Sequence, residues 1–551
     1  MRMNLLRRLS REERGFSMWL VILVLFTTSM FVAAGFAAAN GDIPLSGQSK
    51  DRKQAYAAAE AGLNFYLTHL NQDSDYWTYC DQAPKPTPTE LSPVNQPWNG
   101  TGGDPRVWRN IQGTSAGYTI ELMPIKGTPP KCDINDQTSM IDMSTGMFRI
   151  RSTGRANKAS GDKGNRRSIV AYFRRQGFLD FLYFTYYEDE DPMALATQSQ
   201  RDNATKYCAG LFRPARDASG AGCPEIQFTT GDTVQGPLHT NDSLLICNKP
   251  SFGRTKADRI EVVQPKPLVA APGCSQSAIM NGVLKNPASV LDPPESNAAL
   301  KVVAKNGGDL FTGRTFIHLN GNTMDVTTTT AAGRTYMPGM TLPDNGVIYV
   351  QNDSSGSCAT QYPTQIQYNE SDACGNVYVS GTYSDSLTIA AANDVIVAPT
   401  DGKTVTWGNA ATPFSLTGSN NAVLGLIANN FVRVGHPLKT TTDKYGNTVL
   451  TCNNLTSAYD NGNIQIQAAI LSIDHSFIVD NYNCGNSLGT LSVTGAIAQR
   501  YRGPVGTSAD TGFLKNYKYD DRLKYRSPPH FLNPVDSAWQ IVRENEQVPA
   551  R

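Results

Sequence analysis

The chain has 551 residues, too many for one ordinary domain of about 100–200 residues, so two or more folded regions are expected. Its 49 basic and 48 acidic residues leave a net charge of +1, which argues against a nucleic-acid partner held by bulk electrostatics. Charged residues make up 18%, below the roughly 25% of typical soluble domains, and 47 glycines take part of their place. This composition favours an exported, β-rich protein with many tight turns.

A basic leader occupies residues 1–15, where five arginines outnumber two glutamates. An uncharged apolar segment follows at 16–39, which is longer than the roughly 20 residues that a helix needs to cross a bilayer. The positive charge of the leader predicts that it stays in the cytoplasm and that the rest of the chain is exported. The sequence therefore predicts a transmembrane helix at 16–39, in a single-pass membrane protein with a cytoplasmic N-terminus and an extracytoplasmic body.

Three interpretations of this segment compete. A cleaved secretory signal has an apolar region of about 7–15 residues, which is shorter than this one, whereas an uncleaved anchor fits the length. The segment also resembles the N-terminus of type IV prepilins, because the leader ends at Gly15 and the apolar helix begins at Phe16. That resemblance implies cleavage between Gly15 and Phe16, which stays open here. Leu20 stands where major pilins carry Glu, as in some minor pilins, so an accessory subunit is favoured over a shaft subunit.

A stalk helix is predicted at 40–72, after a break at Gly41 and Pro44. Its apolar positions recur at helical spacing: Tyr56, Ala59, Leu63, Tyr66, Leu67 and Leu70. The stretch A-Y-A-A-A-E-A-G-L-N resembles one common in PilX-like minor pilins. Its small residues permit close packing against a neighbouring helix or against the head of the same protein, although an ordinary amphipathic stalk uses the same residues.

Residues 73–177 are predicted to form a pilin-head-like α+β region. Strands are expected at 117–123, 146–154 and 167–174, paired antiparallel in a small sheet that packs on the stalk helix. Residues 178–224 are interpreted as a linker with a short helix. The aromatic run at its start is expected to be buried between domains.

Residues 225–505 repeat a pattern of short strands separated by polar corners. Asn393-Asp394, Asn429-Asn430 and Asp474 each precede a β-branched or aromatic strand. Such repeats predict a right-handed parallel β-helix or a related β-solenoid, with a β-sandwich as the alternative. The tail at 506–551 is predicted to cap the open end of the solenoid. A ligand-binding role for its aromatic residues is the less favoured interpretation; these are Tyr517, Tyr519, Tyr525 and Trp539.

Ten cysteines lie beyond the apolar segment, and none forms a C-x-x-C pair, so disulfides are favoured over zinc ligands. Connectivity does not follow from sequence alone. The simplest arrangement pairs neighbours: Cys80 with Cys132, Cys208 with Cys223, Cys247 with Cys274, Cys358 with Cys374, and Cys452 with Cys484.

Several motifs between 178 and 542 resemble those of a bacterial family of type IV pilus-associated exported proteins. They include G-D-x-x-x-G-P-L-H-T-N-D, Y-E-x-x-D-P, L-G-L-I-A-N-N and Y-D-x-R-L-x-Y-x-x-P-P-x-F-L. The resemblance implies a prepilin-like N-terminus joined to a β-solenoid-like body, in a family for which no catalytic activity is established. The fold class predicted for the whole chain is therefore mainly β with an N-terminal α-helix.

Patterns that suggest chemistry have simpler explanations. The run E-D-E-D at 188–191 offers paired carboxylates or calcium ligands, but a solvated loop before Pro192 is favoured. G-T-S-A-G at 113–117 lacks the strand and helix of a nucleophile elbow and is expected to be a turn. The histidines show no metal-ligand spacing: His69, His239, His318, His436, His475 and His530. His239 lies beside Asn241 and Asp242, where an Asx turn explains the triplet. No catalytic, cofactor or metal residue is predicted, and calcium binding stays open.

The favoured hypothesis is a structural, minor-pilin-like surface protein for filament assembly or adhesion. Its expected partners are the membrane, other pilin-like subunits contacting the N-terminal helix, and a surface glycan or a host or substratum ligand. The alternative is a membrane-tethered carbohydrate-active enzyme, a lyase or glycosidase on a β-helix. A groove with convergent carboxylates would favour the enzyme.

Overall fold

The computed structural model describes residues 16–72, 76–79, 108–125, 140–142, 147–156, 166–358, 366–405, 414–419, 421–442, 444–446, 448–454, 463–507, 511–524, 526–535, 539–548 and 550. The chain divides into two compact units, which are described separately. Unit 1 comprises Met1–Met140, Phe148–Phe173 and Ile541–Arg551, and unit 2 comprises Ile141–Met147 and Arg174–Gln540. The large segment of unit 2, Arg174–Gln540, is therefore inserted between the second and third segments of unit 1.

A long helix and a small sheet form unit 1. The elements are α1 (Phe16–Gln72), η1 (Tyr76–Tyr79), β1 (Arg109–Asn110), β2 (Gly117–Met123), β3 (Met147–Arg155), β4 (Arg166–Arg175) and β31 (Trp539–Gln547). The five strands are ordered β1-β2-β3-β4-β31, and β2 pairs antiparallel with β1 and β3. The three predicted head strands are confirmed. Because β31 joins this sheet, the prediction that the whole tail caps the solenoid is wrong.

Small residues let the second half of α1 approach the sheet closely. Ala55, Ala58 and Ala59 are buried, and the Ser152 hydroxyl of β3 donates a 2.8 Å hydrogen bond to the Ala59 carbonyl. A Cβ added at Gly154 would lie 2.0 Å from the Ala55 carbonyl oxygen, so only glycine fits there. Leu63, Tyr66 and Leu70 extend the buried face as predicted, whereas Tyr56 is exposed and Leu67 is half-buried. The small-residue face thus packs on the protein's own head.

One prediction about α1 is wrong, and another is not confirmed. The helix runs without a break through Gly41 and Pro44, so the division into a 16–39 helix and a 40–72 stalk is not present in the backbone. Its side chains are described at 18–34 and 49–72. Over the described residues, the helices offer no stretch that is both apolar and long enough to cross a membrane. The transmembrane helix therefore stays a prediction.

Replacing Gly154 with valine should destabilise unit 1, because the new side chain must displace α1 from β3. Overpacking of this kind costs about 1–3 kcal/mol. Thermal unfolding followed by circular dichroism measures the change, and Ala57→Gln, on the exposed side of the same helix turn, serves as the control. Equal melting temperatures for both variants would show that the close approach does not hold the helix.

Unit 2 consists mainly of short strands. The strands are β5 (Tyr183–Thr185), β6 (Thr233–Gln235), β7 (Leu238–Thr240), β8 (Leu244–Ile246), β9 (Ser251–Phe252), β10 (Arg259–Val262), β11 (Leu268–Ala270), β12 (Ile279–Met280), β13 (Val283–Lys285), β14 (Asp309–Thr312), β15 (Arg314–Gly321), β16 (Thr323–Thr330), β17 (Gly333–Thr341), β18 (Val347–Gln351), β19 (Val377–Tyr383), β20 (Leu387–Ala391), β21 (Val395–Val397), β22 (Ser415–Gly418), β23 (Leu424–Ala428), β24 (Val432–Val434), β25 (Leu438–Thr442), β26 (Thr448–Asn454), β27 (Asn463–Ser472), β28 (Phe477–Val479), β29 (Ser487–Gln499) and β30 (Gly512–Tyr519). The helices are η4 (Phe178–Asp180), η5 (Pro192–Ala194), α2 (Gln198–Tyr207), α3 (Arg213–Ser219), α4 (Ala298–Lys305) and η6 (Asp521–Lys524).

These strands form coils that stack in parallel register, which we call the coil stack. One coil consists of β22, β23 and β24, which lie on three successive faces of the stack. Each strand pairs in parallel with the coil before it and the coil after it: β23 pairs with β20 and β27, and β24 pairs with β21 and β28. The predicted corners also stack, because the Asn430 amide donates to the Asn393 carbonyl and the Asp474 amide donates to the Asn429 carbonyl. Parallel pairing of this kind excludes the β-sandwich alternative, whose strands are antiparallel.

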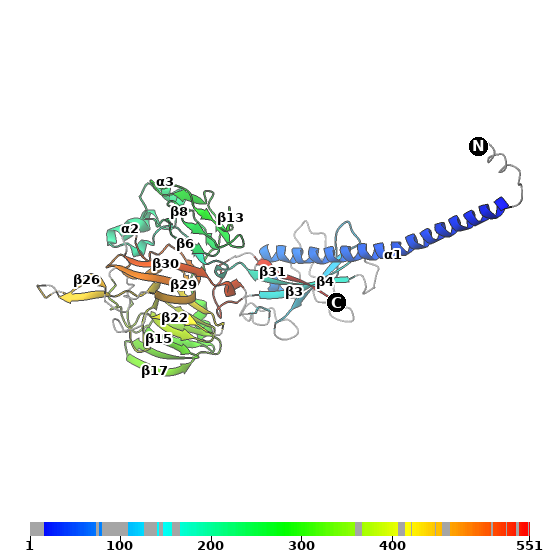
Figure 1. Ribbon diagram of the computed structural model, residues 1–551. Helices are drawn as coiled ribbons and strands as arrows, with labels where there is room; N and C mark the ends of the chain where they lie inside the picture. The colour runs from blue at the N-terminus through cyan, green and yellow to red at the C-terminus, as the bar shows by residue number, and fades with distance from the viewer. Residues whose placement is uncertain are drawn as a thin grey trace, which may run out of the picture. The chain divides into compact units, whose positions relative to one another are not determined.

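The order of the coils along the stack differs from their order along the chain. β29 pairs with β30 on one face and with β5 on the next, and β30 pairs in turn with β6. Strands from the two sequence ends of unit 2 thus complete one rung, the composite coil. In Figure 1 the orange and red β29 and β30 lie between the teal and green β6 and β8 and the green β15 and β17. The stack therefore includes β5 within the predicted 178–224 linker, and β30 within the predicted tail.

Candidate functional site

The first half of α1 presents an apolar surface. Phe16 begins the helix, and Gly15 lies outside the described residues. From 18 to 32 the large apolar side chains are 48–78% exposed: Met18, Trp19, Leu20, Val21, Ile22, Leu23, Val24, Leu25, Phe26, Met30, Phe31 and Val32. The hydroxyls of Thr27, Thr28 and Ser29 donate to backbone carbonyls within the helix, at 2.7–3.1 Å. Because these hydroxyls are satisfied internally, the surface is suited to an apolar environment.

The acidic run at 188–191 is buried, so the prediction of a solvated loop is wrong. Glu188 and Asp191 are 0% exposed and Asp189 is 1% exposed. Glu188 forms an ion pair with Arg502 at 3.3 Å and accepts a hydrogen bond from the Thr185 hydroxyl. Asp191 caps η5 by accepting from the Met193 amide at 2.9 Å. Buried arginine and backbone N–H groups therefore contact these carboxylates in place of the water expected around a solvated loop.

Arg216 is the centre of this polar cluster. Its guanidinium contacts Asp242 at 2.6 Å and Glu225 at 2.9 Å, and lies 3.9 Å from Asp189. Neither carboxylate oxygen of Asp189 has a hydrogen-bond partner in the described structure. Burial raises the pKa of Asp189 to about 8, although the positive charge of Arg216 opposes the shift. Asp189 therefore keeps its proton to a higher pH than an exposed aspartate does.

Replacing Asp189 with asparagine should remove a pH dependence of stability. Between its ordinary pKa and about 8, folded Asp189 holds a proton that the unfolded chain has released, so wild-type stability falls as pH rises through this window. The variant should match the wild type near pH 4 and be the more stable protein at pH 8, by roughly 2–4 °C for each kcal/mol gained. Melting curves across this range test it, with the exposed Asp385→Asn as control. Parallel curves for wild type and D189N would refute the assignment.

His239 has a structural role in the described residues. It is fully buried, and its two ring nitrogens lie 3.1 Å from a Glu261 carboxylate oxygen and 3.0 Å from the Asn241 side-chain oxygen. The Asn241 amide donates to the Leu291 carbonyl at 2.9 Å, and the Asp242 amide donates to the Thr240 hydroxyl oxygen at 3.1 Å. The triplet therefore ties neighbouring coils together: in the described structure the Asn241 side chain bonds to His239 and Leu291 instead of closing the expected Asx turn.

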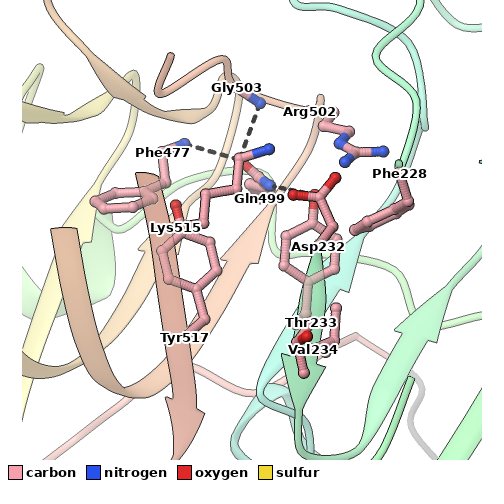
Figure 2. Close-up of a pocket in the computed structure, with 11 residues that line it drawn as sticks. Phe228, Asp232, Thr233, Val234, Phe477, Gln499, Arg502, Gly503, Lys515 and Tyr517 are labelled. Carbon is pink, nitrogen blue, oxygen red and sulfur yellow. Dashed lines mark hydrogen bonds between the residues drawn. The ribbon is translucent and has the colours of Figure 1, made fainter. Parts of the chain in front are cut away.

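A small pocket lies in the composite coil, between β6, β30 and the turn that follows β29. Figure 2 shows Lys515, Asp232 and Arg502 directed toward the same space, among aromatic rings that include Phe228 and Tyr517. The Arg502 guanidinium stacks 3.5 Å from the centre of the Phe228 ring. The space open to the centre of a water molecule is ≈ 20 Å³, about enough for one water. As it stands, the pocket is too small for a sugar ring or an organic cofactor.

Lys515 is the unusual group in this pocket. It continues the inward row of β30 between buried Phe513 and Tyr517 and pairs in register with fully buried Leu491 of β29, but Lys515 itself is half-buried. Loss of hydration lowers the pKa of Lys515 to about 8, and the nearby charge of Arg502 acts in the same direction. A cation in an otherwise apolar row costs stability while it remains charged.

Lys515→Met should therefore stabilise unit 2 at pH 7. Below pH 8 the folded protein must keep the lysine charged, and the wild type recovers stability as pH rises from about 8 to the ordinary lysine pKa. The advantage of the variant should shrink over that range in a comparison of melting temperatures. Lys518→Met, on the exposed side of the same strand, should change little at either pH. A destabilised K515M at pH 7 would contradict this account.

A wider groove lies on the outside of the coil stack, with a volume of ≈ 650 Å³. Phe316 and Tyr378 stack at its base with ring centres 5.0 Å apart, and Arg314 and Arg334 each lie within 6 Å of the Phe316 ring centre. Arg314 is paired with Asp372. Aromatic faces beside charged donors are suited to contact polar ligands, but the groove lacks a second carboxylate facing Asp372 among its described lining residues.

Three of the five predicted disulfides are present: Cys208–Cys223, Cys247–Cys274 and Cys358–Cys374. Cys484 is also disulfide-bonded, while the side chain of its predicted partner Cys452 is not described. The pair Cys80–Cys132 lies outside the described residues. The described residues contain no group of three or more His, Cys, Asp or Glu side chains arranged to hold a metal ion.

Tyr517, Tyr519 and Trp539 of the tail are buried, so they serve packing, and Tyr525 is outside the described residues. The sequence analysis did not single out Lys515, although the alternation of F-L-K-N-Y-K-Y places Lys515 on the same side of the strand as Phe513 and Tyr517. Comparison of the chain with protein-family models, curated proteins and solved structures finds no match.

Proposed function

We propose that this protein is a minor-pilin-like structural subunit, in which the apolar half of α1 is buried against the helices of other pilin-like subunits in a filament. The observation that carries the proposal is the run of apolar side chains that are 48–78% exposed between 18 and 32. A surface of this size is unfavourable in water and marks an interaction site. Before assembly the same surface rests in a membrane, as the prepilin resemblance implies.

The two halves of α1 have different tasks in this proposal. Ala55, Ala59 and Leu63 hold the second half on the sheet of unit 1, which leaves the first half available to partners. Unit 2 is the β-solenoid body that the head carries. Because it is inserted between β4 and β31, both of its chain connections return to the same sheet. Its outer groove, with Phe316 and Arg334, offers a surface for adhesion to a glycan or a host or substratum ligand.

The carbohydrate-active enzyme alternative gains no support from the acidic run. Glu188 and Asp189 are buried beside Arg502 and Arg216 rather than facing the outer groove. A structural subunit requires no such convergence of carboxylates.

The proposal predicts a mature protein that begins at Phe16 and is found in sheared surface filaments. Leu23→Arg should abolish its presence in the filament fraction, since a charge on this surface cannot be buried between apolar helices. Unfolding of units 1 and 2 should be unchanged, because Leu23 is 63% exposed. Mass spectrometry of the N-terminus and immunoblots of filament and membrane fractions measure both, with Lys53→Gln as control.

A mature chain that starts at Met1 or beyond Ala39 would reject the prepilin-type processing. Undiminished incorporation of L23R would reject helix burial as the basis of assembly.

A further inference from the structure

In the part of the chain that the structure describes, one end of the coil stack is left open. Along one inner row, Tyr183 pairs with Leu238, Leu238 with Ile260, and Ile260 with Leu284 of β13. Leu238 and Ile260 are 0% exposed, but Leu284 is 40% exposed. An inward-facing core residue becomes exposed here because no further coil covers it in the described structure. The apolar interior therefore reaches solvent at this end.

The backbone of the last coil is also paired on one side only. Among the described residues, β12 pairs with β9 and β13 pairs with β10, both in parallel, and neither has a partner on the other side. The aliphatic side chains of Ile279, Val283 and Val290 around this edge are 46–48% exposed. Terminal repeats of solenoids normally need a polar cap, and exposed edge strands are templates for pairing with another strand.

The opposite end is built differently. There α4 packs against β14 and β18 and buries Leu300 and Ala304, and the antiparallel hairpin β16–β17 covers the edge of β15. Among the described residues, the chain thus caps one end with its own elements and leaves the β12–β13 end without them. Figure 1 shows β13 and β17 in the two opposite parts of unit 2.

The charge around the open end is strongly one-sided. Residues 249–290 contain six basic and two acidic residues in a chain whose net charge is +1. Both acids are buried, Asp258 at 2% and Glu261 at 1% exposure, so the exposed charges of this region are basic. Side-chain nitrogens of Arg259 and Lys285 lie 3.9 and 3.5 Å from the same carboxylate oxygen of Glu261. The two basic side chains remain 62% and 48% exposed. Arg254 is itself paired with Asp258 and with the exposed Asp521, so the basic rim beside the exposed aliphatic edge consists of Arg259 and Lys285.

We propose that the β12–β13 end binds an extended acidic segment of a partner protein, which adds a strand to β13. Aliphatic side chains at alternate positions of the segment cover Leu284, and its Asp and Glu residues pair with the basic rim. Main-chain hydrogen bonds supply affinity in such strand addition, and the side chains supply specificity. This interaction goes beyond the filament role and does not depend on α1.

Fluorescence anisotropy with three labelled seven-residue peptides and the full-length protein in detergent tests the proposal. The first peptide alternates Val with Glu, the second alternates Val with Lys, and the third is the acidic peptide with its central Val replaced by Pro. The acidic peptide should bind and weaken with added salt, and the other two should bind at least about tenfold more weakly. Equal binding of the proline peptide would overturn strand addition, and so would absence of binding by the acidic peptide.

Two pairs of variants locate the site. Leu284→Asp should lower the affinity for the acidic peptide about tenfold or more, whereas Val302→Asp, on α4 at the capped end and 60% exposed, should leave it unchanged. Lys285→Glu should weaken binding, and Lys301→Glu on α4 should not. Circular dichroism confirms that each variant is folded. Equal effects at the two ends would overturn the assignment, as would a wild-type dimer that L284D dissociates, since a second copy would then be the occupant.

Discussion

The closure of the composite coil is the constraint on which unit 2 depends. A coil cannot bury its apolar side alone, so each must stack on a neighbour on both sides or be capped. The first and last strands of unit 2 in the stack, β5 and β30, lie in its interior, where β29 pairs with both of them. Tyr519 contributes to this joint, since its hydroxyl donates to the Leu179 carbonyl at 2.6 Å, between segments that are far apart in sequence. The two halves of the stack hold together only after both chain ends have arrived.

The buried polar cluster lies at this joint. Arg502 follows β29, Glu188 follows β5 and Asp242 follows β7, so the three residues belong to neighbouring coils around the composite rung. Buried ion pairs contribute little net stability, because desolvation offsets the attraction between the charges. Their better-supported role is to penalise wrong pairings, since a one-residue slip of β5 would leave buried charges without partners. Asp189 is buried in this cluster without a hydrogen-bond partner for its carboxylate in the described structure, and this burial raises its pKa.

Local features of the fold were predictable from sequence, and long-range order was not. The strand at 117–123 and the corners at Asn393 and Asn429 have signals within a few residues. The three disulfides whose two cysteines are both described close loops of 15–27 residues. The axial order of coils depends on pairing between β30 and β6, which are separated by most of unit 2 and have no shared local signal. The acidic run was misjudged for the same reason: its counter-charges, Arg216 and Arg502, come from other parts of the chain. In the candidate site, only the apolar character of the 16–39 segment was readable in advance.

The molecule displays two surfaces of different chemistry, and this difference bears on how many partners it needs. The first half of α1 is apolar with no charge between 18 and 34, so it is suited to other apolar helices or lipid. The β12–β13 end combines aliphatic side chains with an unpaired strand edge and a basic rim, which an apolar helix cannot satisfy, because it offers neither free backbone groups nor acids. One partner chemistry therefore cannot serve both surfaces. A subunit that is held by its helix would still have the edge of β13 available for a second protein.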